Sequence, residues 1–480
     1  MPSRSPFVGF SLIAAVSLAA FAPPRNHEGS TEKNVPQNLT EARDLVDIAK
    51  AAALNIKNDF QRENVLDHIG AAEAKTGQLD AAVETANAAY PFTMATLAAI
   101  GGELGSANDI AKAQIIGAKL KGGQSSTIFA FIAQREAETG NIAQALHTTT
   151  FIHDQAVHSE ALAWVAQKQA EAGDYVGARK TYAQAKAAYP AQGPDSDAVE
   201  VAIAQAQLAR GEKLAAHQTI ISLKSAEFRS AVLLSAAEEL FKEGDQVGSS
   251  AWLAEAMNGL PREQGSSIVR YMAIPIQVKL GQLNQAMQSA GGLPTEAHIK
   301  GYTAVAVTCA EIGDIPGMNA ALEKMLSGAD SIGANREFSN HESMLMILNV
   351  AAALIDNGKF EDASRLLMLI EQHLDEIAKL TIEPEAQLER VALMAHQGQF
   401  DESRSLAMKM RPDAVANVER GTALRTIASL QTKKEGDTSS RRWALTLPDP
   451  EDRAYSLLGI AQSLLGIDDV KLPYSAIFVH

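Results

Sequence analysis

Two short segments of this chain match part of a metal-binding or a phosphate-binding motif, but each lacks a residue that the motif requires. His341-Glu342 opens like the zinc-binding helix of a metalloprotease, but Leu345 stands where the second histidine ligand is required. Residues 117–122 have the glycine spacing of a phosphate-binding loop, but Gly123 replaces the lysine that would reach the phosphates. We therefore interpret the first segment as a solvated loop and the second as a helix end.

The other residue types that could act as ligands or nucleophiles also form no recognisable site. His147, His153 and His158 are close in the sequence, but their offsets do not place them on one helical face, as a shared metal ion would need. Cys309 is the only cysteine, and no base lies near it in the sequence, so a small buried thiol is expected. The sequence therefore predicts no catalytic residue, no metal ion and no cofactor.

Composition restricts both the core and the partners. The chain has 42 Lys and Arg against 57 Asp and Glu, a net charge of −15, and no basic cluster, so it should repel nucleic acid. Apolar residues make up 46% of the 480 residues but aromatic residues only 5%. A core of this composition is expected to consist of closely packed helices with small residues between them.

The amino-terminal residues have the form of a secretory signal. Arg4 precedes an apolar run over 7–22 that ends in Ala20-Phe21-Ala22, although Pro23 disfavours cleavage directly after Ala22. The run is shorter than the roughly 20 apolar residues that span a bilayer. We expect residues 1–22 to direct export to a periplasm or out of the cell and to leave no stable membrane span. Residues 23–40 are polar and are expected to form a flexible leader.

Beyond residue 41 the chain shows one period. Glycines that suit helix ends recur over 389 residues (466 − 77), with a mean interval of about 35, which is typical of helical-hairpin repeats. The twelve predicted turn glycines are Gly77, Gly105, Gly140, Gly173, Gly211, Gly244, Gly281, Gly313, Gly358, Gly398, Gly436 and Gly466. The longest interval contains the polar stretch 327–342, where we expect a possible bend in the array.

Small residues keep a fixed distance from these glycines. Seven residues before the glycine, ten of the twelve repeats have Gly, Ala or Ser, and five residues after it, eight of the twelve have Ala or Ser. Such positions are expected where two helices cross closely, because a larger side chain would hold the helices apart.

This pattern resembles the tetratricopeptide (TPR) repeat family. The clearest copies are Ala166/Gly173/Ala178, Ala133/Gly140/Ala145 and Gly70/Gly77/Ala82, while the large aromatic residues and the closing proline of the family are mostly absent. The resemblance implies an all-α fold over residues 41–480, a right-handed α-solenoid of about twelve helix-turn-helix repeats. It also implies that the first helix of each repeat lines a concave binding face.

Two classes of function remain open. The first is a non-catalytic scaffold or adaptor that binds a protein or peptide on the concave face, and the second is an all-helical hydrolase of the α/α-barrel type that acts on a saccharide. Short turns and few aromatic residues favour the scaffold. Six residues before four successive turn glycines stand the candidate ligand-binding residues of that face: Gln134, Gln167, Gln205 and Glu238.

Overall fold

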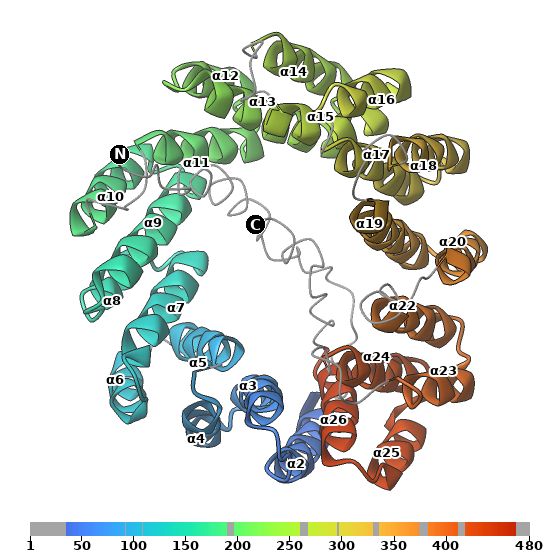
Figure 1. Ribbon diagram of the computed structural model, residues 1–480. Coiled ribbons are helices and arrows are strands. Elements are labelled where there is room, and N and C mark those ends of the chain that lie inside the picture. The colour runs from blue at the N-terminus through green and yellow to red at the C-terminus, as the bar shows by residue number, and fades with distance from the viewer. Residues whose placement is uncertain are drawn as a thin grey trace, which may run out of the picture. The chain divides into compact units, whose positions relative to one another are not determined.

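The computed structural model describes residues 35–91, 93–107, 109–189, 196–259, 267–294, 297–329, 336–373, 383–410 and 418–466. Within these ranges the regular structure consists of twenty-four α-helices, α2–α20 and α22–α26, and no strand is present (Figure 1). The all-helical prediction is therefore confirmed. The described residues fall into two compact units, of which unit 1 holds 97–276 and unit 2 holds 35–96 together with 277–466.

Unit 1 is built of consecutive helical hairpins. In the four hairpins over residues 124–258 a longer first helix is followed by a shorter second helix that packs against it. The helices are α5 (Met94–Ala107), α6 (Ile110–Lys119), α7 (Gln124–Glu138), α8 (Ile142–Thr149), α9 (Gln155–Glu171), α10 (Tyr175–Ala188), α11 (Ser196–Ala209), α12 (Lys213–Ile221), α13 (Ala226–Lys242), α14 (Gln246–Asn258) and α15 (Ser267–Lys279). Helices α5 and α15 continue across the boundary between the units.

Unit 2 contains the hairpins from both ends of the described chain. Its helices are α2 (Val35–Ala53), α3 (Asp59–Lys75), α4 (Leu79–Ala89), α16 (Leu283–Gly291), α17 (His298–Ile312), α18 (Ile315–Ala329), α19 (Arg336–Asp356), α20 (Phe360–His373), α22 (Glu383–His396), α23 (Phe400–Ala407), α24 (Val418–Glu435), α25 (Asp437–Thr446) and α26 (Pro450–Leu464).

Glycine ends the first helix of a typical hairpin, and in several hairpins an acidic residue follows it at the start of the second helix. Gly173 has φ +88°, a left-handed conformation that costs glycine little. The Gly173 and Asp174 amides donate to the carbonyl oxygens of Ala170 (2.8 Å) and Gln169 (2.9 Å), closing the end of α9. Asp174 Oδ1 then accepts from the Gly177 amide at 2.8 Å and caps α10.

Eleven of the twelve predicted turn glycines have positive φ, and Gly105 is the exception. Gly105 lies inside α5, and a Cβ placed on it would come within 2.8 Å of Arg135 Cβ and 2.9 Å of the Ile132 carbonyl oxygen of α7. The turn follows instead at Asp109, whose carboxylate accepts from the Lys112 amide. The prediction for Gly105 was wrong because close helix packing selects glycine as strongly as a left-handed turn does.

The small residues predicted at helix crossings lie in the core. All eight small residues that follow the glycine by five positions are fully buried: Ala82, Ala145, Ala178, Ala216, Ser249, Ala286, Ala363 and Ser403. Among the residues seven positions before the glycine, Ala98 is only half-buried. Ala98 was counted from Gly105, so the wrong turn assignment also explains this exception.

The last hairpin of unit 2 is assembled from the two ends of the chain. Helix α26 packs against α24. The helix that takes the place of a second helix beside α26 is α2, which also contacts α3 (Figure 1). Fully buried Leu45 and Ala49 of α2 share one apolar cluster with Leu457 and Ile460 of α26. Polar contacts also join the two ends, because Arg441 Nη1 lies 3.4 Å from Glu41 Oε1 and the Tyr455 hydroxyl donates to Asn64 Oδ1 at 3.2 Å.

Several predicted boundaries differ from the structure or lie outside its described part. Helix α2 begins at Val35, so the last residues of the predicted leader are helical. His341-Glu342 lies inside α19 and not in a solvated loop. The signal at 1–22 and the rest of the leader lie outside the described residues. Of the predicted bend at 327–342, residues 330–335 also lie outside them, and the other residues are in α18 and α19. No helix in the described ranges has both the length and the apolar character needed to cross a membrane.

Candidate functional site

The four predicted binding residues lie on four neighbouring first helices of unit 1. Helices α7, α9, α11 and α13 pack side by side in one row, and Figure 1 shows their second helices in a separate row. Ala133, Ala166, Ala204 and Ala237 are buried between helices, and the next residue in each case, Gln134, Gln167, Gln205 or Glu238, is half-buried. Because a step of one residue turns an α-helix by about 100°, the four polar side chains leave the core on the same side of the row.

Two of these residues have the same local geometry. Gln134 Nε2 donates to Glu138 Oε1 at 3.0 Å, and Gln167 Nε2 donates to Glu171 Oε1 at 3.2 Å, each one helical turn along. The bond holds the amide so that its carbonyl oxygen remains available as an acceptor. Each glutamate also pairs with a base of the same helix, at 3.3 Å from Arg135 to Glu138 and 2.7 Å from Lys168 to Glu171.

The other two predicted residues do not share this geometry. The residue one turn after Gln205 is Ala209, so no carboxylate stands in the corresponding place. Glu238 lies 4.0 Å from Lys242, and that lysine makes a shorter contact of 2.8 Å with Glu239. The structure therefore places all four side chains on one row of helices but repeats a single arrangement only in α7 and α9.

Two aromatic residues belong to this arrangement: Phe131, which the sequence analysis missed, and Trp164, which the sequence alone assigns to the core more readily than to a ligand platform. Phe131 and Trp164 lie three residues before the glutamines and are half-buried on the same helices. Aligning the two repeats on their turn glycines would have found them, because residues 131–138 read FIAQREAE and residues 164–171 read WVAQKQAE. An aromatic ring, an amide and a paired carboxylate thus recur together in adjacent repeats.

A second recurring polar pair, which the sequence analysis also missed, lies between the two helices of the α3–α4, α7–α8 and α11–α12 hairpins. The fully buried Glu136 accepts from the Thr148 hydroxyl at 2.6 Å, Glu73 accepts from Thr85 at 2.6 Å, and Gln207 accepts from Thr219 at 2.8 Å. In each case the acceptor precedes the turn glycine by four residues and the hydroxyl follows the glycine by eight. These bonds join the first and second helices of a hairpin, so they are part of the fold and not of a surface site.

The two buried glutamates differ in their second oxygen atom. Glu73 Oε1 lies 2.8 Å from Lys50 Nζ, whereas Glu136 Oε1 is buried without a hydrogen-bond partner. Burial raises the pKa of Glu136 above its ordinary value, and the Thr148 hydroxyl and the nearby His147 act in the opposite direction.

A third group of ionisable residues lies at the start of α26. Burial, followed by the charges of Asp449 and Asp452, raises the pKa of the half-buried Glu451 to about 7. Asp449 caps the helix by accepting from the Glu451 and Asp452 amides at 2.9 and 3.2 Å, and Arg420 forms an ion pair with Asp452. Capping and ion pairing explain these carboxylates structurally, so they provide no separate support for a hydrolase.

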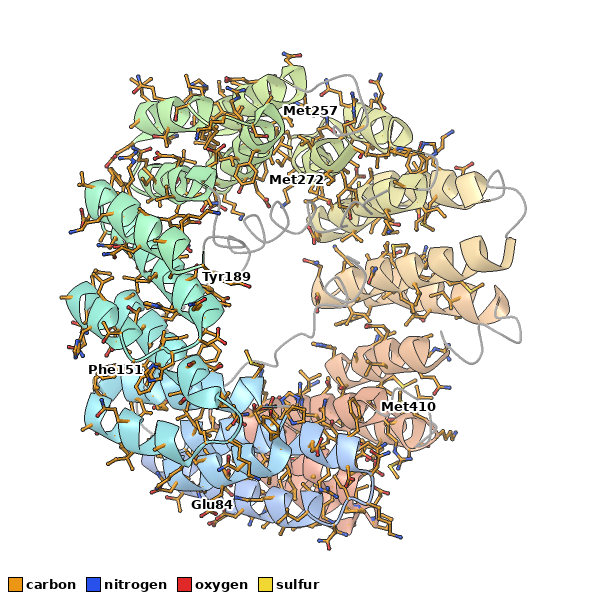
Figure 2. All side chains as sticks on the ribbon, turned by 60° about the vertical axis from the view of Figure 1, so that its left-hand side comes forward. Glu84, Phe151, Tyr189, Met257, Met272 and Met410 are labelled. Atoms are coloured by element: carbon orange, nitrogen blue, oxygen red, sulfur yellow. The ribbon has the colours of Figure 1, made fainter. Side chains whose placement is uncertain are left out.

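The other residues considered in the sequence have structural roles. Cys309 is fully buried, as predicted, and burial together with Asp314 raises its thiol pKa to about 12, which keeps the thiol protonated. His147 packs edge-on against Phe151, which is labelled in Figure 2 and stacks on Phe129 of α7 at 5.4 Å. No group of three or more metal-ligand side chains is close enough to hold an ion in the part of the chain that the structure describes.

Comparison with known proteins adds little to this picture. No family model matches the chain, and no curated protein matches it. The chain is similar to a solved structure described as a circular tandem repeat protein with novel repeat topology and enhanced subunit contact surfaces, with 11% identity over 91% of this chain and 96% of that chain. The TM-score of 0.17 carries no argument about the shape or function of this chain. The class of protein that the fold defines is an all-helical repeat protein.

Proposed function

We propose that this chain is a non-catalytic scaffold that binds an extended segment of a protein partner on the first-helix row of unit 1. The observation that carries the proposal is the repeated geometry of α7 and α9, where Gln134 and Gln167 make the same bond to a glutamate one turn along. Regularly spaced amide oxygens suit the regularly spaced N–H groups of a peptide backbone, which would be bound with little sequence preference.

The acids and the aromatic residues extend this proposal. Glu138 and Glu171 offer carboxylates beside the amides, and Phe131 and Trp164 offer apolar area beside them. A TPR-like, right-handed superhelix would place this face on its concave side, as in the family that the sequence resembles. We further propose that residues 1–22 export the protein, so the partner is expected in a periplasm or outside the cell.

Site-specific photo-crosslinking tests the binding face. A photoreactive amino acid placed at Gln134 or Gln167 is expected to capture the same protein, whereas the same residue at Ala183, an exposed position of α10, is expected to capture none of it. With the photoreactive residue kept at Gln134, replacing Gln167, Gln205 and Glu238 together with Ala should then abolish capture of that protein while the helical content stays the same. Capture that is equal from Ala183, or unchanged in this triple variant, would refute the assignment of the face.

Export is tested separately. The test uses a reporter enzyme that is active only outside the cytosol, fused after residue 34, directly before α2. The reporter is expected to be active when residues 1–22 are present. A reporter that remains in the cytosol contradicts the proposed localisation, and this outcome does not bear on the binding face.

A further inference from the structure

Gly102 of α5 takes the place that Gln134 and Gln167 have in the next two repeats. The repeats can be aligned on the N-cap residues of their second helices: Asp109 of α6, Asn141 of α8 and Asp174 of α10. Gly102, Gln134 and Gln167 each precede that N-cap residue by seven positions. Because Gly105 lies inside α5 and is not a turn glycine, a count from Gly105 does not show this correspondence.

Side-chain hydrogen bonds connect Gly102 to the proposed binding face. The Ser106 hydroxyl donates to the Gly102 carbonyl oxygen at 2.8 Å and accepts from Arg135 Nε of α7 at 2.9 Å. Arg135 also pairs with Glu138, which accepts from the Gln134 amide at 3.0 Å. A continuous chain of contacts therefore joins this turn of α5 to the first of the two repeated glutamines.

The packing of the fold explains the neighbouring glycines of α5 but not Gly102. A Cβ placed on Gly101 would collide with Phe131 Cβ, and one placed on Gly105 would come within 2.8 Å of Arg135 Cβ. These two glycines let α5 and α7 lie side by side (Figure 1). A Cβ on Gly102 would have no atom of the described residues within 4 Å beyond its own stretch of helix.

The backbone conformation does not explain Gly102 either. Gly102 lies inside α5 and is not among the glycines with positive φ. Glycine within a helix is less favourable than alanine, because it loses more conformational freedom on folding. A residue that lowers stability without a structural reason is typical of a functional site.

The missing side chain lowers this part of the surface. In α7 and α9 the position seven residues before the N-cap holds a glutamine, and the position three residues before it holds a glutamate. In α5 the same two positions are the half-buried Gly102 and the exposed Ser106. A bound chain can therefore bring its own backbone into van der Waals contact with α5, as glycine allows in other close approaches. A partner helix could not do so, because its own side chains surround its backbone.

We propose that Gly102 is a specificity-determining residue of the binding face, where the backbone of an extended partner segment passes directly over α5. This inference rests on the proposed function and extends its face by one helix, from α7 and α9 to α5. Gly102 then selects an extended segment over a helical one, because any side chain at this position would hold the backbone of the segment away from α5.

Fluorescence anisotropy with the full chain tests this inference. The probe is a labelled library of randomised peptides of about twelve residues, long enough in extended form to cross three packed helices that lie roughly 8–10 Å apart. Gly102→Leu is expected to weaken binding of these peptides by about tenfold, because the added side chain occupies the space of the segment. Gly102→Ala adds one methyl group and is expected to weaken binding less. Both variants should melt at or above the wild-type temperature, because leucine and alanine are better helix formers than glycine.

Two further variants sharpen the test. Gly102→Gln gives α5 the residue that α7 and α9 hold at this position, and it is expected to weaken binding as Gly102→Leu does. Ala183→Leu adds the same side chain at an exposed position of α10 and is expected to leave binding unchanged.

Three results would overturn the inference. One is unchanged binding by Gly102→Leu although replacement of Gln134 and Gln167 with Ala abolishes binding, since the proposed face would then stand without α5. Another is tighter binding by Gly102→Gln, which would mean that α5 lacks only one member of a row of glutamines. The third is equal weakening by Ala183→Leu, which would assign the effect to added apolar surface. Peptides that fail to bind the wild type up to about millimolar concentration would refute the proposed function itself, and this inference with it.

Discussion

Replacing Glu136 with Gln is expected to stabilise the protein at neutral and alkaline pH. Glu136 is fully buried, accepts one hydrogen bond from Thr148 at 2.6 Å, and has a second oxygen atom without a partner. Gln207, which occupies the same repeat position, makes the corresponding bond with Thr219. The same position of the α11–α12 hairpin therefore already accommodates an amide.

The size and sign of the effect follow from burial. A buried polar group without a partner costs about 1–3 kcal/mol, and more when it is charged, so E136Q should gain about 1–2 kcal/mol where Glu136 would otherwise ionise. Because its folded pKa is raised above the ordinary value of 4.5, the folded state binds the proton more tightly than the unfolded chain does. Wild-type stability therefore falls as pH rises from about 4.5 through the raised pKa, and the advantage of the variant appears over that window.

Urea unfolding followed by circular dichroism at about pH 4 and about pH 8 measures this difference. The variant and the wild type should be nearly equal at the lower pH, and the variant should be more stable at the higher pH. Glu171→Gln removes an exposed carboxylate paired with Lys168 and is expected to change stability by no more than about 1 kcal/mol at either pH. An E136Q effect of the same size at both values would refute the reasoning.

Three further predictions concern other parts of the fold. Gly173→Ala should destabilise the protein by about 1–2 kcal/mol because φ at this position is +88°. Gly102→Ala should be neutral or stabilising because Gly102 is helical and has open space around it. Thermal melting compares the two variants. Leu45→Ala should cost about 2–5 kcal/mol, and its unfolding should be visible in the fluorescence of Trp443, which packs on the same cluster. The wild type should lose stability as pH rises from about 4.5 to above 7, because the folded pKa of Glu451 is raised to about 7. Glu451→Gln should not show this loss. Identical profiles of stability against pH for the two proteins would contradict the raised pKa.

The hairpins were predictable because each depends on local features of the sequence. A left-handed glycine, an acidic cap and small residues at fixed offsets all act within one repeat, so Gly173, Asp174 and Ala178 identify their hairpin without its neighbours. Gly105 shows the limit of this reasoning. Its role depends on the approach of Arg135 from the next hairpin, which a count of residues within one repeat does not reveal.

The candidate sites were predictable only in part for the same reason. The small residues of the core indicated which side of each first helix faces outward, so the positions of Gln134 and Gln167 followed. Which polar residues act together depends on contacts one turn away or across the hairpin, such as those of Glu138 and Thr148.

The closing hairpin of unit 2 could not be predicted from periodicity, although its parts are visible in the sequence. Helix α26 has the buried face of a first helix, and the helix that covers this face, α2, precedes it by about four hundred residues. No short turn tethers the two helices, so their association must overcome a loop-closure entropy that a local hairpin does not bear. Apolar burial of Leu45, Leu457 and Leu458, each fully buried, provides the opposing free energy. It follows that α2 cannot reach its final packing before α26 has been synthesised, and that unit 2 can be completed only after both ends of the chain are present.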